Sequence, residues 1–248
     1  MEYKILSDIG NLRKQNEDFC GGEIISDDNE EIGIFIIADG MGGHKKGEVA
    51  SKLAVENTLY FLRKNLIKCN YEDENEITSI LKQSYNYANT IVYRTSLYEK
   101  EHEGMGTTLT TALVYNDNLY VANIGDSRCY LFRNGRLEKI TNDNSLIQEL
   151  IDKGAITEDE ALTHPQRNVI TRAIGTDEYI KIDFYKENVT KNDKILLTTD
   201  GLTNSVPIED MEKVLNSTID LDSCCTKLIS LAKDKGGHDN ISVICISI

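Results

Sequence analysis

Tryptophan, proline and long apolar runs are absent or scarce in this chain of 248 residues. There is no tryptophan, and Pro165 and Pro207 are the only prolines. No Gly/Ser-rich linker, internal repeat or shift in composition marks a boundary, so we expect residues 1–248 to form a single domain. The hydrophobic content of 40% is enough to fill a sizeable core.

Signals for export and for the membrane are also missing. No apolar run reaches the roughly 18 residues that a membrane span requires, and residues 1–10 do not resemble a signal peptide. The six cysteines show neither CxxC spacing nor the density of a secreted disulfide scaffold, which favours reduced and mostly buried thiols. We therefore expect a cytoplasmic protein without membrane insertion.

Positive charge is in the minority, with 27 Lys and Arg against 41 Asp and Glu and a formal net charge of −14. Binding to a nucleic acid requires many Lys or Arg side chains that neutralise phosphates. This balance argues against a nucleic-acid partner.

Several motifs of catalysis are absent as well. Neither GxGxxG nor GxxxxGK[ST] occurs, so a kinase or a P-loop protein lacks support. HExxH and GxSxG are missing too, and the chain has only four histidines. Because carboxylates dominate over histidine, Mg²⁺ or Mn²⁺ fits this composition better than Zn²⁺.

The pattern of β-branched, aromatic and turn-forming residues predicts an α+β fold. Strands are expected at residues 3–7, 32–38, 107–114, 119–124, 128–132, 180–184, 194–199 and 242–246. Helices are expected at residues 47–65, 76–98, 146–153, 158–162, 209–215 and 221–235. The short connections at 116–118 and 134–135 are typical of hairpins and predict an antiparallel meander. Long helices between blocks of strands favour sheets packed together with helices outside.

The chain does contain an acidic residue at one end of each of four apolar, strand-like runs: Asp39, Asp126, Asp200 and Asp239. Such residues lie at the rims of buried strands, where they can converge. Carboxylates a few ångströms apart repel one another unless protons or cations neutralise them, and a hard divalent metal is the natural counterion. The pattern therefore predicts a metal-dependent hydrolase that acts on a phosphoester.

Simpler explanations exist for each of these residues. Gly40 can let the chain turn with its carbonyl exposed as a ligand for Mg²⁺ or Mn²⁺, but an Asp-Gly pair after a strand can also be merely a turn. Asp126 can pair with Arg128 or cap a turn. Arg13 has a guanidinium that matches two phosphate oxygens, but it can also be a surface residue paired to Asp8 or Glu17.

Seven segments, in this order, resemble the motifs of the metal-dependent (PPM, type 2C) protein serine/threonine phosphatases, in particular their compact bacterial branch. They extend over residues 8–243 and read SDIGNLRKQNED, ADGMGGHKKGEVAS, GTTLT, NIGDSR, HPQRNVITRAIG, TTDGLT and GGHDNISV. The resemblance implies a central antiparallel β-sandwich of two sheets flanked by helices on both sides, in four layers. It also implies a helical flap at about residues 142–174 beside the active site, anchored by residues 164–167.

The resemblance implies two Mn²⁺ or Mg²⁺ ions per site with a possible third. Asp39 matches the aspartate that bridges two metals, and Gly40 matches the glycine whose carbonyl binds one of them. Asp200 and Asp239 match the remaining ligands of the other metal. Asp126 matches the ligand of the third, more weakly held metal, which Asp200 is a candidate to share.

Other residues match positions around the metals. Arg13 matches the arginine that binds the substrate phosphate. Glu17 and Asp18 match acidic residues that hold metal-bound waters, and Asn240 would support the cluster from its edge.

The activity implied by the resemblance is hydrolysis of phosphoserine and phosphothreonine monoesters by direct attack of a water that bridges two metals. No phosphoenzyme is required, and Arg13 and the metals neutralise charge on the phosphoryl oxygens. The implied partners are phosphorylated proteins, including a bacterial Hanks-type serine/threonine kinase that the enzyme opposes. We expect a monomer.

Two positions depart from family patterns. Eukaryotic relatives carry histidine where this chain has Met41, which cannot protonate the leaving alkoxide, so a metal-bound water or His44 is needed for that step. His44 can equally be structural. Asn144 stands where bacterial relatives commonly show histidine, a difference expected to alter the flap slightly.

Two other functions compete with a protein phosphatase. The same metal chemistry could act on a small phosphomonoester, and the groove that would separate these substrates is not readable from sequence. A non-catalytic binding module with the same fold is the third possibility, which the intact metal and phosphate positions disfavour.

Overall fold

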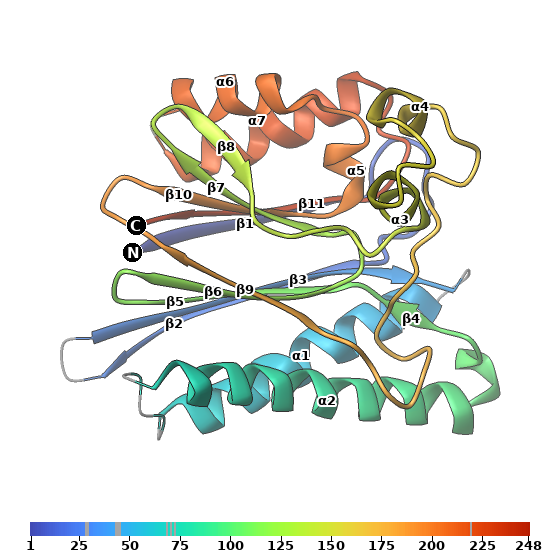
Figure 1. Ribbon diagram of the computed structural model, residues 1–248, viewed down its shortest axis with the longest axis horizontal. Coiled ribbons are helices and arrows are strands. Elements are labelled where there is room, and N and C mark those ends of the chain that lie inside the picture. Colours follow the sequence, from blue (N-terminus) through green and yellow to red (C-terminus); the bar gives the residue numbers. More distant parts are fainter. Residues whose placement is uncertain (28–29, 43–45, 68, 70, 72, 219) are drawn as a thin grey trace.

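The computed structural model describes residues 1–27, 30–42, 46–67, 69, 71, 73–218 and 220–248. Two antiparallel sheets pack face to face, and helices cover the outer face of each sheet (Figure 1). The two chain ends lie close together at one end of this sandwich. The predicted α+β class and the four-layer arrangement are confirmed.

The first sheet contains both chain termini and has the strand order β1-β11-β10-β7-β8. Its outer face is covered by helices α6 (Ile208–Ser217) and α7 (Leu221–Asp234). The strands are β1 (Glu2–Asp8), β7 (Arg128–Arg133), β8 (Arg136–Lys139), β10 (Lys194–Thr198) and β11 (Ile241–Ser247).

The second sheet has the order β2-β3-β5-β6-β9, with β4 beside the end of β3. Helices α1 (Lys46–Leu66) and α2 (Glu74–Tyr98) cover its outer face. The strands are β2 (Asp18–Asp27), β3 (Glu30–Met41), β4 (Gly106–Thr107), β5 (Leu109–Tyr115), β6 (Asn118–Ile124) and β9 (Asp183–Asn188).

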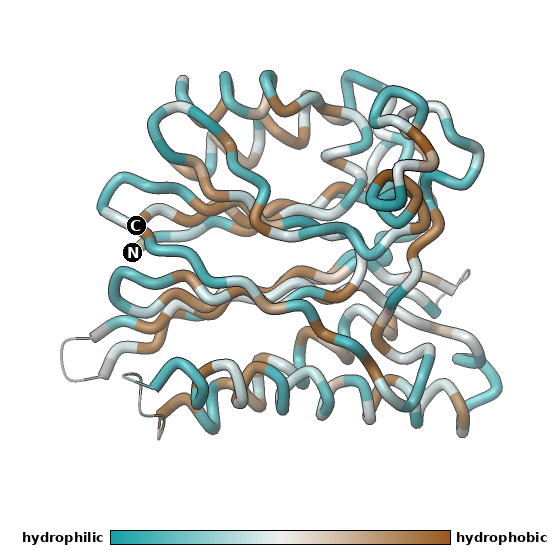
Figure 2. Tube along the Cα trace, viewed as in Figure 1, coloured by the Kyte–Doolittle hydropathy of each residue, from teal (hydrophilic) through white to brown (hydrophobic). Residues whose placement is uncertain are grey.

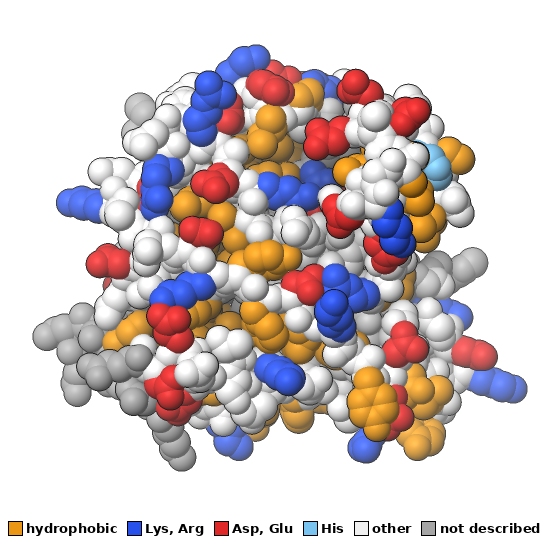
Figure 3. Space-filling view, viewed as in Figure 1, with side chains coloured by type: hydrophobic (Ala, Val, Ile, Leu, Met, Phe, Trp, Pro, Cys, Tyr) orange, Lys and Arg blue, Asp and Glu red, His pale blue; other side chains and the backbone are white. Residues whose placement is uncertain are grey.

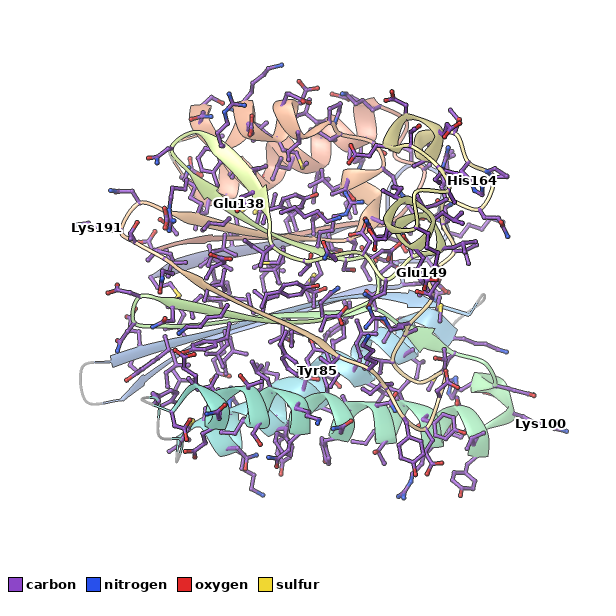
Figure 4. All side chains as sticks on the ribbon, viewed as in Figure 1. Tyr85, Lys100, Glu138, Glu149, His164 and Lys191 are labelled. Carbon is purple, nitrogen blue, oxygen red and sulfur yellow. The ribbon has the colours of Figure 1, made fainter. Side chains whose placement is uncertain are left out.

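The apolar residues of β3 serve two cores at once. Ile34 and Ile36 pack toward α1 and α2, whereas Phe35 and Ile37 pack between the sheets. Successive side chains of a strand point to opposite faces, so a strand covered on both sides must be apolar throughout. Figure 2 shows the resulting apolar segments along the inner strands. Tyr85 extends from α2 toward the sheet (Figure 4), where its hydroxyl donates to the Ala122 carbonyl over 2.7 Å.

Short helices lie at the end of the sandwich away from the termini (Figure 1). Ser145 caps α3 (Leu146–Asp152), and Thr157 forms a capping box with Glu160 in α4 (Glu158–Leu162). The other short elements are α5 (Asp200–Thr203), directly after β10, and the 3₁₀ turn η1 (Lys100–His102). No helix in the described ranges is long and apolar enough to cross a membrane.

Some predicted elements were wrong or incomplete. The strands β2 and β8 and the helix α5 were not predicted, and the strand expected at residues 180–184 begins only at Asp183. The sequence of β2 contains Gly21-Gly22 and little apolar periodicity, so local propensity does not reveal it. It forms because residues 18–27 pair along their whole length with β3. The strand expected at 107–114 is divided between β4 and β5.

Candidate metal centre and active site

A pocket of about 260 Å³ opens at the edge of the sandwich where the acidic strand ends meet. Residues from the first loop, β3, the β6–β7 turn, α5 and the start of β11 converge on it, together with two residues of the segment 142–174. Its lining consists of Arg13, Glu17, Asp39, Gly40, Met41, Gly42, Thr108, Asp126, Asn168, Ile170, Asp200, Asp239 and Asn240. The predicted convergence of residues 39, 126, 200 and 239 is thus present in the structure.

Asp39 sits on a rigid part of β3. Its backbone N–H donates to Thr108 Oγ1 over 2.8 Å, and its carbonyl accepts from Thr107 Oγ1 over 2.8 Å. A further bond of 2.9 Å runs from the Thr108 N–H to the same carbonyl. These contacts fix the backbone from which the Asp39 carboxyl enters the pocket.

Gly40 does not make a turn, contrary to the simpler explanation, because β3 continues through Met41. Glycine is needed there for close packing: a Cβ at Gly40 would lie 2.0 Å from the carbonyl oxygen of Gly47 at the start of α1. Conversely, a Cβ at Gly47 would lie 2.6 Å from the Gly40 carbonyl oxygen. This close approach of Gly47 to Gly40 was not predicted from the sequence.

Asp200 begins helix α5. Its Oδ2 accepts from Asn204 Nδ2 over 2.9 Å. Its buried Oδ1 has no hydrogen-bond partner among the described residues. Gly201 lets the chain pass the Asn240 carbonyl, from which a Cβ would be only 1.9 Å away.

Asp18 lies directly opposite Asp39 in the β2–β3 register and is buried. Thr199 Oγ1 donates to Asp18 Oδ2 over 2.9 Å, whereas Oδ1 has no partner in the described part of the chain. Buried polar atoms are normally paired. The orphaned oxygen of Asp200, which lines the pocket, and that of Asp18, which pairs with Asp39 across the strands, therefore favour a ligand such as a cation.

Burial and mutual repulsion disturb the protonation of these carboxyls. Burial, and then the charges of Asp200 and Asp239, raise the pKa of Asp18 to about 7. Burial, Asp200 and Asp143 likewise raise the pKa of Asp126 to about 7. The raised pKa values indicate that too little positive charge lies near these carboxylates to balance them.

The two central carboxyls are affected in the same way. Burial raises the pKa of Asp39 well above its usual value, and Asp18, Asp200, Asp126 and Asp239 add to the shift. Burial and the charge of Asp239 raise the pKa of Asp200, although interaction with the Asp39 carboxyl partly opposes this. The carboxyls at positions 39, 200 and 239 therefore lie within electrostatic reach of one another.

In the ranges that the structure describes, no three His, Cys, Asp or Glu side chains are arranged so that they could hold a metal ion together as they stand. The chemistry of the donor set nevertheless fits a hard divalent cation, since the pocket is lined by Gly40 and by the carboxyls of Asp39, Asp126 and Asp200, whose pKa values are raised.

Arg13 reaches this cluster from the first loop. Its Nη2 donates to Asp239 Oδ2 over 2.7 Å. Asp8 instead pairs with Lys233 over 2.9 Å, so the suggested Arg13–Asp8 pair is not formed. Burial lowers the pKa of Arg13, but the charge and the hydrogen bond of Asp239, together with the charges of Glu17 and Asp39, outweigh burial and raise the pKa overall.

Asn240 holds the loop that carries Arg13. Its Nδ2 donates to the carbonyls of Ile9 and Gln15 over 2.9 and 3.0 Å, and its Oδ1 accepts from the Glu17 N–H over 2.8 Å. The Glu17 carbonyl accepts in turn from the Gly40 N–H over 3.1 Å. The edge of the pocket thus depends on one buried amide.

The alternative ion pair of Asp126 is not observed. Arg128 instead binds Asp143 with two nitrogens, the shortest contact being 2.7 Å. Asp126 therefore stays available at the pocket, next to Gly125, whose φ is +102°.

Three further positions from the sequence analysis are Met41, His44 and His164. Met41 lines the pocket, whereas His44 lies outside the described residues. His164, at the outer edge of the segment 142–174 (Figure 4), accepts at Nδ1 from the Gln166 N–H over 3.2 Å. This contact is local to the tetrapeptide 164–167.

Sequence reasoning missed several pocket residues. Asn168 and Ile170 line the pocket, and Thr108, Ser127 and Thr199 make the hydrogen bonds beneath it. The segment GTTLT, which contains Thr108, was one of the seven that resemble phosphatase motifs, but no role was predicted for Thr108 itself.

Comparisons with known proteins agree with this geometry. A family model described as "Protein phosphatase 2C" matches residues 13–235. The chain belongs to the protein phosphatase 2C family. This phosphatase is 36% identical over 246 residues to the "Serine/threonine phosphatase stp" of Listeria monocytogenes serotype 4b, covering 99% of this chain and 95% of the relative. The bacterial serine/threonine phosphatase class predicted from the motifs is confirmed.

Solved structures lead to the same conclusion for this phosphatase. The S. agalactiae serine/threonine phosphatase superposes with a TM-score of 0.89 at 33% identity, covering 100% of this chain and 99% of the other. The catalytic domain of the phosphatase PstP, solved in complex with two manganese ions, superposes with a TM-score of 0.82 at 32% identity. That match covers 98% of this chain and 96% of the other. The family is metal dependent.

Proposed function

We propose that this phosphatase hydrolyses phosphoserine and phosphothreonine monoesters of proteins with two divalent cations, Mn²⁺ or Mg²⁺, and a third held more weakly. The observation that supports this most directly is the convergence of the Asp39, Asp126 and Asp200 carboxyls, whose pKa values are raised, on one pocket. A family member that holds two manganese ions adds support.

Asp39 and the Gly40 carbonyl would hold one cation, and Asp39, Asp200 and Asp239 the other. Asp126, with Asp200, would hold the third. When bound, the cations supply Lewis acidity and a water that is deprotonated near neutral pH. Outside these ligands, Glu17 and Asp18 would accept hydrogen bonds from the waters that complete the coordination, and Asn240 supports their edge of the pocket.

Arg13 would orient the substrate phosphoryl group. Its guanidinium is anchored on Asp239 by one nitrogen, which leaves other N–H groups to bind phosphoryl oxygens in a fork. Because this donor is preorganised at the pocket rim, it stabilises the charge that shifts as the ester bond loosens.

The leaving seryl or threonyl oxygen must gain a proton, which the thioether of Met41 cannot supply. His44 is our candidate for a substrate-side role there. The segment 142–174 is our candidate for the flap, because Asn168 and Ile170 from its second half line the pocket.

A protein substrate is consistent with the charge of the molecule. Lys and Arg side chains are scattered among acidic ones on the face drawn in Figure 3, and the net charge is −14. We propose a single-domain monomer that opposes a serine/threonine kinase.

A direct experiment measures hydrolysis of 4-nitrophenyl phosphate and of matched phosphothreonine and phosphotyrosine peptides, with Mn²⁺ and with EDTA. We expect turnover only with the metal and preference for the phosphothreonine peptide. Activity that survives chelation would contradict the metal mechanism. Turnover of small phosphomonoesters without peptide hydrolysis would instead support the small-molecule alternative.

A further inference from the structure

We propose that Asn144 is a positioning residue that couples the flap, residues 142–174, to the loop that carries Asp126. The part of this proposal that concerns Asp126 rests on the proposed function, in which Asp126 binds a cation. The part that concerns the flap rests on geometry alone.

Asn144 clasps Gly125 from both sides. The Asn144 side chain is buried. The backbone N–H of Asn144 donates to the Gly125 carbonyl over 2.8 Å, and the side-chain Oδ1 of Asn144 accepts from the Gly125 N–H over 3.0 Å. Gly125 has a positive φ, and a Cβ there would lie 2.5 Å from Thr108 Cγ2. The backbone directly before Asp126 is therefore held in an unusual conformation by these two bonds.

The same residue ties the two ends of the flap together. The Asn144 carbonyl accepts from the Thr171 N–H over 2.8 Å, and its Nδ2 donates to Asp183 Oδ2 over 2.9 Å. Asp183 also binds Arg172 through two bonds of 2.9 and 2.6 Å. Asn144, Arg172 and Asp183 thus form the root of the flap, and Asn144 alone of the three also bonds the Gly125 backbone through its side chain.

Further hydrogen bonds connect this region to the backbone of Asp39. Ser127, next to Asp126, shares a hydrogen bond of 2.7 Å with Thr108, whose Oγ1 accepts from the Asp39 N–H. Breaking a buried hydrogen bond costs free energy, because the donor or acceptor that loses its partner cannot bond to water instead. A displacement of the flap root is therefore transmitted to Asp126 rather than absorbed locally.

The proposed coupling between the flap and the Asp126 loop can be tested by exchanging the amide of Asn144 and the carboxylate of Asp183, which bond to each other. Asn144→Asp keeps the acceptor for Gly125 but places a carboxylate against Asp183. We expect amide hydrogen exchange in residues 146–169 to become about tenfold faster, and calorimetric binding of the weakest Mn²⁺ to weaken about tenfold. Adding Asp183→Asn lets the new amide donate to the carboxylate at 144, although it gives up one of the two bonds from Arg172, so both values should return at least about threefold toward the parent.

Asp193→Asn serves as the matched control. Asp193 is a buried carboxylate that also pairs with an arginine, Arg133. It is two residues from Lys191, which lies at the opposite end of the molecule (Figure 4). This variant should lower the melting temperature without faster exchange in the flap. The proposal is wrong if Asn144→Asp behaves like this control, or if the double variant recovers neither value. Unchanged Mn²⁺ stoichiometry in Asp126→Asn would instead refute Asp126 as a ligand, and the exchange data would still decide the role of Asn144 in the flap.

Discussion

Asp39 combines two opposed properties. Its carboxyl is buried against other carboxyls, which raises its pKa and makes the charged form unfavourable. The same crowding makes it a strong site for a cation. Asp39 is therefore expected to lower the stability of the metal-free protein, an arrangement common where a site is built for binding rather than for stability.

Asp39→Asn should reduce Mn²⁺-dependent hydrolysis by about 10²-fold to 10³-fold, because in the proposed site Asp39 is the ligand that two cations share. In EDTA at pH 8 the same variant should melt about 2 to 4 °C higher, equivalent to about 1 kcal/mol, because a buried like charge is removed. Both effects can be read from turnover and from melting curves. A lower melting temperature in EDTA would show that repulsion at Asp39 is not the dominant effect.

Gly40 should tolerate no side chain. Gly40→Ala places a methyl group against the Gly47 carbonyl, so we expect a loss of about 3 kcal/mol in the free energy of unfolding. Gly154→Ala is the matched control, because its φ of +67° is strained but no atom lies within 4 Å of the added Cβ. That control should cost about 1 kcal/mol in urea unfolding. Equal losses in the two variants would contradict the close-packing explanation.

The first loop illustrates how elements depend on one another. Residues 9–17 have no regular secondary structure along most of their length, yet they carry Arg13 to the pocket. Asn240, directly before β11, binds this loop at three backbone groups. The position of Arg13 is therefore decided by an element at the other end of the chain.

Asn240→Ala should free this loop. We expect KM for a phosphothreonine peptide to rise about tenfold, with a smaller fall in kcat, because the loss of about 1 to 2 kcal/mol of hydrogen bonding affects the placement of Arg13. Asn216→Ala, which removes an exposed amide bound to the Glu212 carbonyl, should leave KM unchanged. An unchanged KM in Asn240→Ala would show that the loop is held by other contacts.

The stability of the whole molecule should depend on pH and metal together. Asp18 and Asp126 have pKa values of about 7 in the folded, metal-free protein, against about 3.9 in an unfolded chain. The folded state therefore holds more protons between these values. The stability that these groups contribute is fully present below about pH 4 and is lost as the pH rises through about 7.

In EDTA, the melting temperature should consequently fall between about pH 5 and pH 8, and Mn²⁺ should restore it most at pH 8, where protons no longer compete for the carboxylates. Differential scanning calorimetry across this range checks both statements. Asp126→Asn should flatten the fall in EDTA. A metal-free melting temperature that rises steadily to pH 8 would contradict the assigned pKa directions.

Much of the fold was predictable because its main signals are local. The two-sided apolar run of β3, the apolar stripe of α2 and the asparagine turns each follow from neighbouring residues. The strand β2 was not predictable, because pairing with β3 compensates for its weak propensity. The four aspartates were found for the same local reason, since each adjoins an apolar strand.

Which groups those aspartates meet follows from contacts between distant residues. Arg13 and Asp239 are 226 positions apart, and no local pattern pairs them in preference to Asp8 or Glu17. The close approach of Gly40 and Gly47, the orphaned oxygens of Asp18 and Asp200 and the clasp of Asn144 on Gly125 likewise arise only when the sheets and the flap come together. Local composition sets the kinds of groups available to the site, while burial and distance, which set their charge and partners, are properties of the packed molecule.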